Sequence, residues 1–252
     1  MTGAAAKRSG LGRVAPIPTW RWIALSLAIV AGCGGVTPRP SSGDADPASA
    51  AAALGLRLPA TFRGDLPCAD CEGIRHHLDL WPDQVFHLRR EWRGRDLVRD
   101  DIGRWRTDPA RQTLMLRSGG EMALQFEIKS PDRLRLLDTR GAPIVSTLPY
   151  DLAGAPLAPT ELRLALAGEM TYLADATRFT ECLTGRSYPV APEGDVVAMQ
   201  RAYLALAEAP GARLYVSFDG TIAERARMEG AGSERSVVVD RFGAAAPGRR
   251  CE

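Results

Sequence analysis

The chain has 252 residues, 45% of them hydrophobic and 25% charged, a composition typical of a globular protein with a sizeable core. The only charged side chains in residues 1–32 are Lys7, Arg8, Arg13 and Arg21, and removing these four from the 32 basic residues leaves 28 against 30 acidic ones. A chain with this balance has no general attraction for polyanions, so we exclude nucleic-acid binding.

Residues 1–32 have the layout of an export signal. A basic lead ends at Arg21, an apolar run extends from Trp22 to Val30, and two small residues precede Cys33. The apolar run is too short to span a bilayer as a permanent helix. The four residues that end at Cys33, Val-Ala-Gly-Cys, resemble the lipobox of bacterial lipoproteins, in which cleavage precedes the cysteine and its thiol and amine are acylated.

Acylation at Cys33 would anchor the mature protein in a membrane, since each buried methylene of a palmitate-like chain contributes roughly 0.8 kcal/mol. The next residue is Gly34. An aspartate at this position is the signal for retention in the inner membrane of enteric bacteria. We therefore expect an outer-membrane lipoprotein that faces the periplasm.

The segment 33–57 is rich in Gly, Pro, Ser, Asp and Ala and has almost no large apolar side chain before Leu56. A segment of this composition cannot bury a core of its own. We expect a disordered tether between the lipid and the folded part.

Residues 58–150 alternate apolar and polar side chains with period two, as in Met122, Leu124, Phe126 and Ile128. This pattern predicts short antiparallel strands. Turn signals separate the strands: Pro82-Asp83, Asp108-Pro109, Ser118-Gly119-Gly120 and Arg140-Gly141. Because an open sheet would expose its edges and one apolar face, we expect a small barrel or half-barrel.

Residues 151–160 contain Pro156 and Pro159 and are interpreted as a linker before a second domain, 161–252. Strand patterns over 162–172, 213–222 and 236–242 surround one helix candidate, Asp195 to Ala209. In this helix Asp195 is the expected cap, Pro210-Gly211 is the stop signal, and one stripe carries the apolar side chains Val196, Met199, Tyr203 and Leu206. A sheet crossed by one helix favours a barrel of the oligonucleotide-binding (OB) type.

Apart from Cys33, the cysteines are Cys68, Cys71, Cys182 and Cys251. An even number in an exported protein favours disulfides, and three pairings are open. The spacing favours Cys68 with Cys71 and Cys182 with Cys251. The chain-entropy model gives about 2 kcal/mol of stabilisation for the short loop, before strain, and roughly 4 kcal/mol for the long one.

The Cys68-x-x-Cys71 motif has four interpretations: a structural disulfide, a redox sensor, a thiolate metal site and an oxidoreductase centre. An oxidoreductase needs its thiolate at a helix N-terminus. Here Pro67 precedes the motif and an alternating, strand-like run follows over 74–80, so an oxidoreductase is disfavoured. The short pair is expected to be the labile disulfide and the long pair the structural one.

The three histidines, His76, His77 and His87, all follow this motif closely. Thiolate and imidazole both suit copper, so Cys68, Cys71, His77 and His87 are a candidate metal set. If Leu80 pairs with Gln84, His77 lies opposite His87 on the polar face and His76 joins the apolar face. The favoured alternative is a solvated strand with His76 partly buried.

Enzyme motifs are absent: the sequence has no Gly-x-Ser-x-Gly, no His-Glu-x-x-His and no phosphate-binding glycine loop, so we expect no catalysis. The aromatic residues of the first domain have two interpretations, a ligand pocket of lipocalin type or core packing, of which core packing is commoner. They are Trp92, Trp105, Phe126 and Tyr150.

Two stretches resemble the NlpE family of copper-homeostasis outer-membrane lipoproteins. The first is Phe-Arg-Gly-Asp-Leu-Pro-Cys-Ala-Asp-Cys-Glu-Gly-Ile over residues 62–74, and the second is Tyr-Leu-Ala-Asp-Ala from residue 172, followed by Phe179, Cys182 and Thr184-Gly185. The resemblance implies a lipocalin-like N-terminal half-barrel carrying the Cys-x-x-Cys motif, then an OB-type barrel held by a disulfide. By position, Cys68 and Cys71 are the motif cysteines, and Cys251 is the partner of Cys182.

The family is associated with copper tolerance and with signalling to the Cpx envelope-stress kinase. The resemblance therefore implies a non-catalytic sensor that acts by protein contact and by cysteine redox or metal state, with a Cpx-type kinase as partner and copper as a ligand that is not required. Two alternatives are a lipocalin-like carrier of a small apolar ligand and a periplasmic copper-binding chaperone.

Overall fold

The computed structural model describes residues 47–119 and 123–251. The expected signal peptide, Cys33 and the tether up to residue 46 lie outside the described residues. The described part consists of two β-barrels that belong to one compact unit. Within it, neither helix is long and apolar enough to cross a membrane.

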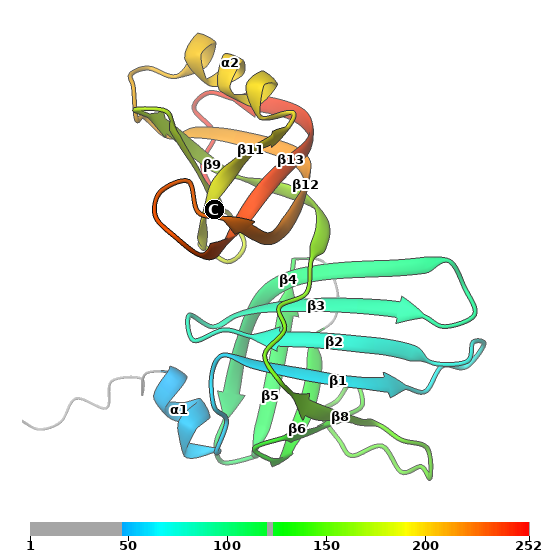
Figure 1. Cartoon of the computed structure of the whole chain (residues 1–252). Helices are drawn as coiled ribbons and strands as arrows, with labels where there is room; N and C mark the ends of the chain where they lie inside the picture. The colour runs from blue at the N-terminus through cyan, green and yellow to red at the C-terminus, as the bar shows by residue number, and fades with distance from the viewer. Residues whose placement is uncertain (1–46, 120–122, 252) are drawn as a thin grey trace, which may run out of the picture. The chain divides into compact units, whose positions relative to one another are not determined.

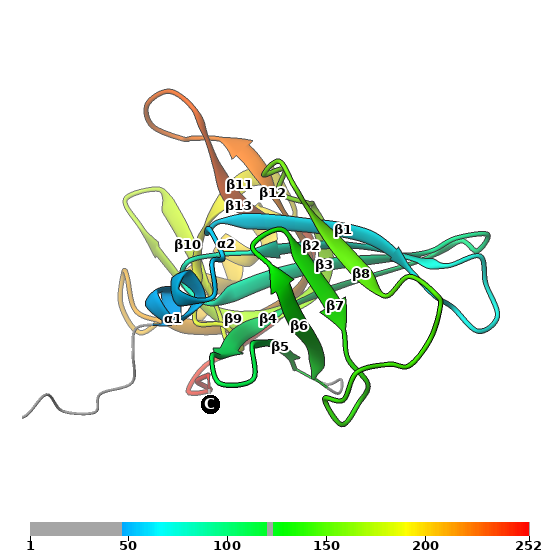
Figure 2. The ribbon, with the colours of Figure 1, turned by 90° about the horizontal axis from the view of Figure 1, so that it is seen from below.

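The first barrel contains eight antiparallel strands in chain order, and β1 pairs with both β2 and β8 to close it. Figure 1 shows the meander, and Figure 2 shows the same strands from below. The strands are β1 (Ala60–Leu66), β2 (Ile74–Leu80), β3 (Val85–Trp92), β4 (Leu97–Asp108), β5 (Thr113–Ser118), β6 (Leu124–Ser130), β7 (Arg133–Leu136) and β8 (Asp151–Ala155). The period-two pattern thus correctly predicted a barrel, which is closed.

The core of this barrel is built from the apolar side chains that alternate along its strands. Leu114 and Leu116 of β5 and Phe126 and Ile128 of β6 are buried, while their sequence neighbours face outward or are half-buried. Trp105 of β4 is fully buried in the same cluster. One face of each strand is therefore removed from water, which supplies the main free energy of folding of this domain.

Two parts of the expected domain organisation are wrong. Helix α1 (Pro47–Ala53) occupies the end of the predicted tether, and Ala51 and Leu56 are buried in the core of the first barrel. Strand β8 lies inside the predicted linker, since its pairing with β1 and β7 closes the barrel. Only residues 156–161 connect the two barrels.

The second barrel has the strand order β10-β11-β13-β12-β9 and is also closed (Figure 1). Neighbouring strands are antiparallel except for β11 and β13, which are parallel. The strands are β9 (Leu162–Leu173), β10 (Ala176–Glu181), β11 (Ser187–Gly194), β12 (Leu214–Ala226) and β13 (Ser233–Ala246), with helix α2 (Val196–Leu206) between β11 and β12. A five-stranded barrel with one helix is the architecture expected for an OB-type domain.

Helix α2 packs through the predicted stripe. Val196, Met199 and Tyr203 are buried, whereas Leu206 in the last turn is 42% exposed. The predicted cap is wrong in detail: Asp195 stands at the N-cap position, but its carboxylate accepts a hydrogen bond from the backbone N–H of Phe242 on β13, at 2.9 Å. Asp195 therefore attaches the helix start to the sheet.

Candidate functional site

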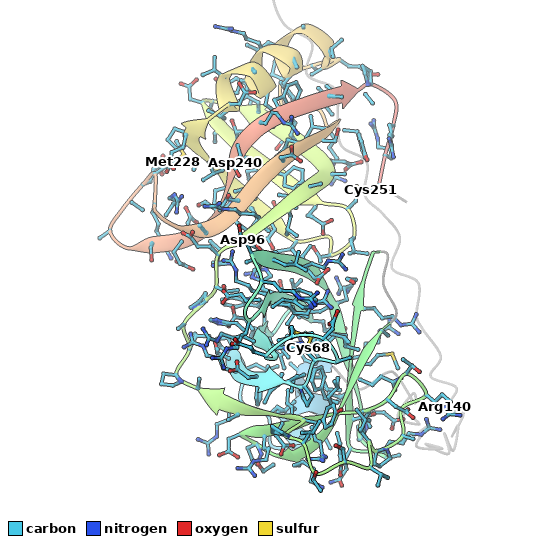
Figure 3. The ribbon with its side chains drawn as sticks, turned by 90° about the vertical axis from the view of Figure 1, so that its right-hand side faces the viewer. Cys68, Asp96, Arg140, Met228, Asp240 and Cys251 are labelled. Carbon is cyan, nitrogen blue, oxygen red and sulfur yellow. A yellow bond between two sulfur atoms is a disulfide. The ribbon has the colours of Figure 1, made fainter. Side chains whose placement is uncertain are left out.

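The first candidate site is the Cys68–Cys71 disulfide in the loop that joins β1 to β2 (Figure 3). The Cα atoms of the two cysteines are 5.3 Å apart, and both side chains are half-buried. Leu66 ends β1 in the core and Ile74 starts β2, so the sheet holds the two ends of the loop side by side. The cysteines lie in the loop just before β2, the strand that the sequence predicted to follow them, and neither belongs to a helix.

Ion pairs hold this loop against the turn between β3 and β4. Arg95 donates to the backbone carbonyl of Asp70 at 2.5 Å and pairs with its carboxylate at 2.8 Å. Arg93 pairs with Asp65, near the end of β1 before the loop, at 2.8 Å. These side chains are exposed, so each pair contributes little to the free energy of unfolding. The contacts therefore orient the loop more than they stabilise the domain.

Cys68, Asp70 and Cys71 offer one ligand atom each, and these three atoms lie within 4.8 Å of one another. Among the described residues this is the one such group of cysteine, histidine and carboxylate side chains. The sulfur atoms are covalently paired in this state and cannot act as thiolates. Metal binding and disulfide formation are thus alternatives at this loop.

The second disulfide joins Cys182, just after β10, to Cys251 near the C-terminus, with Cα atoms 5.1 Å apart. Figure 3 shows Cys251 at the end of the segment that follows β13. The guanidinium of Arg249 lies over the ring of Tyr215, 4.1 Å from its centroid. Both cysteines line a cavity of about 890 Å³, so a small reductant has access to this bond.

Glu181 shapes the turn that carries Cys182. Its buried carboxylate accepts hydrogen bonds from the backbone N–H of Leu183 at 2.9 Å and of Thr184 at 2.7 Å, and from the Thr184 hydroxyl at 2.6 Å. A carboxylate with three donors holds the turn in one conformation. Cys182 is therefore presented in a preorganised position.

The expected histidine geometry is wrong. Leu80 pairs with Phe86, two residues beyond the expected Gln84, so His77 lies opposite Arg89, and His87 lies opposite Asp79. The structure does not bring His77 and His87 together with Cys68 and Cys71 as one ligand group. His77 instead pairs with the buried carboxylate of Asp79, at 3.2 Å.

His76 lies on the apolar face, as predicted, and is 5% exposed. Burial lowers the pKa of its imidazole from 6.5 to about 4, against the opposing effect of a hydrogen bond to the backbone carbonyl of Ile74 at 2.9 Å. His76 is therefore a neutral core residue whose ring nitrogen donates to that carbonyl.

His87 is fully buried where the two barrels meet. Its Nε2 lies 3.3 Å from the Tyr188 hydroxyl of β11, and its Nδ1 lies 3.0 Å from Nη2 of Arg235 on β13. Both ring nitrogens are occupied, so His87 cannot serve as a metal ligand here. Sequence reasoning missed Tyr188 and Arg235, which lie 101 and 148 residues away in the chain and carry no local motif.

The aromatic residues of the first barrel pack in or near its core. Trp105 and Phe126 are fully buried within the apolar cluster, and Trp92 and Tyr150 are half-buried. The indole N–H of Trp105 donates to the backbone carbonyl of Trp81 at 3.0 Å. Core packing therefore accounts for Trp105 and Phe126, the two best buried members of the set.

An eight-stranded barrel followed by an OB-type barrel, each with its own disulfide, defines a class of two-domain β proteins. The family model of the NlpE N-terminal domain matches residues 62–147, and that of the NlpE C-terminal OB domain matches residues 161–252. The chain belongs to the NlpE family.

One curated relative supports this assignment, and one solved structure is similar. Lipoprotein NlpE of Escherichia coli (strain K12) is 32% identical over 188 residues, which cover 72% of this chain and 73% of that protein. The crystal structure of the Cpx pathway activator NlpE from Escherichia coli is similar at 26% identity and a TM-score of 0.34, covering 77% of this chain and 98% of the other.

Proposed function

We propose that the protein is an outer-membrane lipoprotein, anchored by acyl chains on Cys33 and facing the periplasm, that reports envelope stress to a sensor kinase of the Cpx type. The observation that carries this proposal is the 32% identity to lipoprotein NlpE across both domains. The solved relative is described as an activator of the Cpx pathway. The proposed mode of action is protein contact, with no catalytic step.

In this proposal, the state of the Cys68–Cys71 loop decides whether the protein contacts the kinase. The residues of this loop are tied to the β3–β4 turn by the exposed Arg95–Asp70 contacts and by one backbone hydrogen bond, from Arg93 N–H to the Gly73 carbonyl at 2.9 Å. Exposed pairs contribute little free energy, so we expect the residues around Cys68 and Cys71 to rearrange when the bond is reduced. Reduction would leave two thiols beside the carboxylate of Asp70. In this proposal the partner distinguishes the oxidised loop from the reduced or metal-bound loop.

Copper fits the reduced loop better than the oxidised one. Two thiolates are soft ligands that favour Cu(I), and the Asp70 carboxylate lies within reach of both sulfur atoms. Bound copper would hold Cys68 and Cys71 in the reduced state, since a metal-bound thiolate pair is not free to form a disulfide. A role in copper homeostasis follows from this competition.

Reporter cells would test the sensor role. The wild-type chain, a Cys33→Ala variant that cannot be acylated, and the Cys68→Ser/Cys71→Ser pair would be expressed in bacteria that carry a Cpx-dependent reporter, with Asp96→Asn as a surface control. We expect wild type and D96N to raise the reporter equally, and the other two variants to change its level. Equal output from all four chains, or no output from wild type, would contradict the proposal.

A Cu(I) titration would test the metal state separately. The reduced wild-type protein should bind one Cu(I) per chain in competition with a chromogenic chelator, whereas the oxidised protein and the Cys68→Ser/Cys71→Ser variant should not. A His77→Gln/His87→Gln variant serves as the control and should retain binding. Equal binding by oxidised and reduced protein would remove the copper role and leave the contact role standing.

A further inference from the structure

Four side chains from the two barrels form a cluster, here called the His87 cluster: the buried His87, Tyr188 and Arg235 and the half-buried Trp81. The indole N–H of Trp81 donates to Nδ1 of His87 at 3.3 Å, and Arg235 Nη2 lies 3.0 Å from the same nitrogen. Arg235 also donates to the backbone carbonyl of Thr160 at 2.8 Å, at the end of the connection between the barrels. The cluster therefore joins strands of the first barrel to strands of the second.

The hydrogen bonds define the protonation state of His87. Indole and guanidinium nitrogens only donate, so Nδ1 must accept from both Trp81 and Arg235. The ring proton must then lie on Nε2, from which it donates to the Tyr188 hydroxyl at 3.3 Å. A second proton on Nδ1 would face two donors, one of them a cation. The cluster thus requires neutral His87.

The charged and titratable groups that face His87 come from both barrels. They are His77 and Asp79 on β2, Asp83 in the β2–β3 turn, Arg89 on β3, Asp100 on β4, Arg186 just before β11, Tyr188 on β11, Glu224 on β12 and Arg235 on β13. Burial lowers the pKa of His87 well below its usual value of 6.5, and Arg235 and Arg186 lower it further. Glu224 lies 4.0 Å from Arg235 and balances only part of this positive charge.

Asp79 is the buried carboxylate directly opposite His87 in the β2–β3 pairing, and other groups already bind it. Its Oδ1 accepts from the Thr61 hydroxyl at 2.6 Å and contacts His77 Nε2 at 3.2 Å, and its Oδ2 accepts from the backbone N–H of Thr160 at 2.9 Å. Three donors thus already share the Asp79 carboxylate, and its negative charge is divided among them.

We propose that the His87 cluster is an acid-released latch between the two barrels. Protonation of Nδ1 removes the acceptor that Trp81 and Arg235 share and places two cations in contact, so the second barrel moves away and both groups become hydrated. Neutralisation restores the acceptor and closes the latch. This inference concerns the arrangement of the barrels and does not depend on the proposed sensor function.

The size of the effect follows from linkage. His87 in the open state should titrate near its usual value of about 6.5, whereas in the closed state it stays neutral over the range of interest. The open-to-closed ratio then rises about tenfold at pH 5.5 and about a hundredfold at pH 4.5, relative to its value above pH 7. The latch should therefore open progressively as the pH falls from about 6.5 to about 4.5.

Small-angle X-ray scattering of the chain from residue 34 onward, between pH 7.5 and 4.5, would test the latch, with far-UV circular dichroism showing that both barrels stay folded. We expect the radius of gyration of wild type to rise below pH 6. The matched control His77→Gln, which changes a histidine on the same sheet, should follow wild type. His87→Gln should lose the pH response, whether it rests closed or open.

Two further measurements keep the proposal testable if His87→Gln folds poorly. Arg235→Met removes the cation from Nδ1 and should weaken the pH response of an otherwise folded chain. Nitrogen-15 spectra at pH 7.5 should show His87 as the Nε2–H tautomer. A constant radius of gyration in wild type down to pH 4.5, an unchanged response in His87→Gln or Arg235→Met, or the Nδ1–H tautomer would overturn the proposal.

Discussion

The buried carboxylate of Asp79 accepts a hydrogen bond from the backbone N–H of Thr160, 81 residues later, at 2.9 Å. Asp79 belongs to β2 of the first barrel, and Thr160 lies two residues before the second barrel begins at Leu162. The other carboxylate oxygen accepts from the hydroxyl of Thr61 on β1. One side chain therefore attaches the connection between the barrels to two strands of the first.

Replacing this carboxylate by an amide should destabilise the first barrel. In Asp79→Asn one oxygen becomes an N–H₂ group that cannot accept from Thr61 or Thr160, so a buried donor loses its partner at a cost of about 1–3 kcal/mol. Urea unfolding followed by tryptophan fluorescence would measure it, because every tryptophan after residue 33 lies in the first barrel. The exposed Asp96→Asn is the control, and equal midpoints for the two variants would contradict the role of Asp79.

Acid should weaken the first barrel through His76. Its pKa is lowered to about 4 by burial in the folded state, against 6.5 in the unfolded chain, so the unfolded chain binds more protons between these values. Neutral His76 therefore costs no stability above pH 6.5. Below that pH, the free energy of unfolding should fall by about 1.4 kcal/mol per pH unit as the pH drops toward 4. His76→Gln should show a shallower fall in urea midpoints than His77→Gln, and identical slopes would refute this origin.

The two disulfides should differ in their effect on stability. Replacing Cys182 and Cys251 by serine opens a loop of about 70 residues and should cost the second barrel roughly 4 kcal/mol, whereas replacing Cys68 and Cys71 should cost the first barrel about 2 kcal/mol or less. Tryptophan fluorescence reports the first barrel, and hydrogen exchange of the β12–β13 amides reports the second. If replacing Cys68 and Cys71 cost more free energy of unfolding than replacing Cys182 and Cys251, the long disulfide would not be the structural one.

Gly168 on β9 should not tolerate a side chain. A Cβ atom there would lie 2.1 Å from the backbone oxygen of Thr180 on β10 and 2.7 Å from the ring of Phe179. Because the clash is with backbone, Gly168→Ala should separate β9 from β10 and lower the thermal midpoint of the second barrel by several degrees. Gly119→Ala, whose Cβ meets only Leu183 at 3.4 Å, should be close to neutral. Equal midpoints for both variants would show that the strands can move apart without cost.

The sequence predicted the parts of the fold that local patterns encode. The alternation of apolar and polar side chains around Phe126 predicted a sheet with one buried face, and the closed first barrel has such a face. The apolar stripe of Val196, Met199 and Tyr203 is the buried face of α2. The favoured cysteine pairing is confirmed at both bridges. Helix α1 and strand β8 were missed because their short, Ala- and Gly-rich sequences carry no apolar period.

The histidine register could not be obtained from alternation. A shift of two residues leaves every side chain on the same face, so pairing Leu80 with Gln84 or with Phe86 satisfies the hydrophobic pattern equally. The turn decides between them, and here Gln84 adopts a positive φ of 66° while its backbone N–H donates to the carbonyl of Trp81. The candidate copper set depended on the wrong register.

By itself, the sequence determined which side chains face a core and which cysteine pairing is favoured, because both depend on spacing along the chain. It also showed the family, through the two motif-bearing stretches that begin at residues 62 and 172. Only the tertiary structure decided which polar groups meet. His87 is opposite Asp79 because of the register between β2 and β3, and it contacts Arg235 because two barrels come together at that point. No local pattern specifies such a contact, since its partners are joined only by the folding of the whole chain.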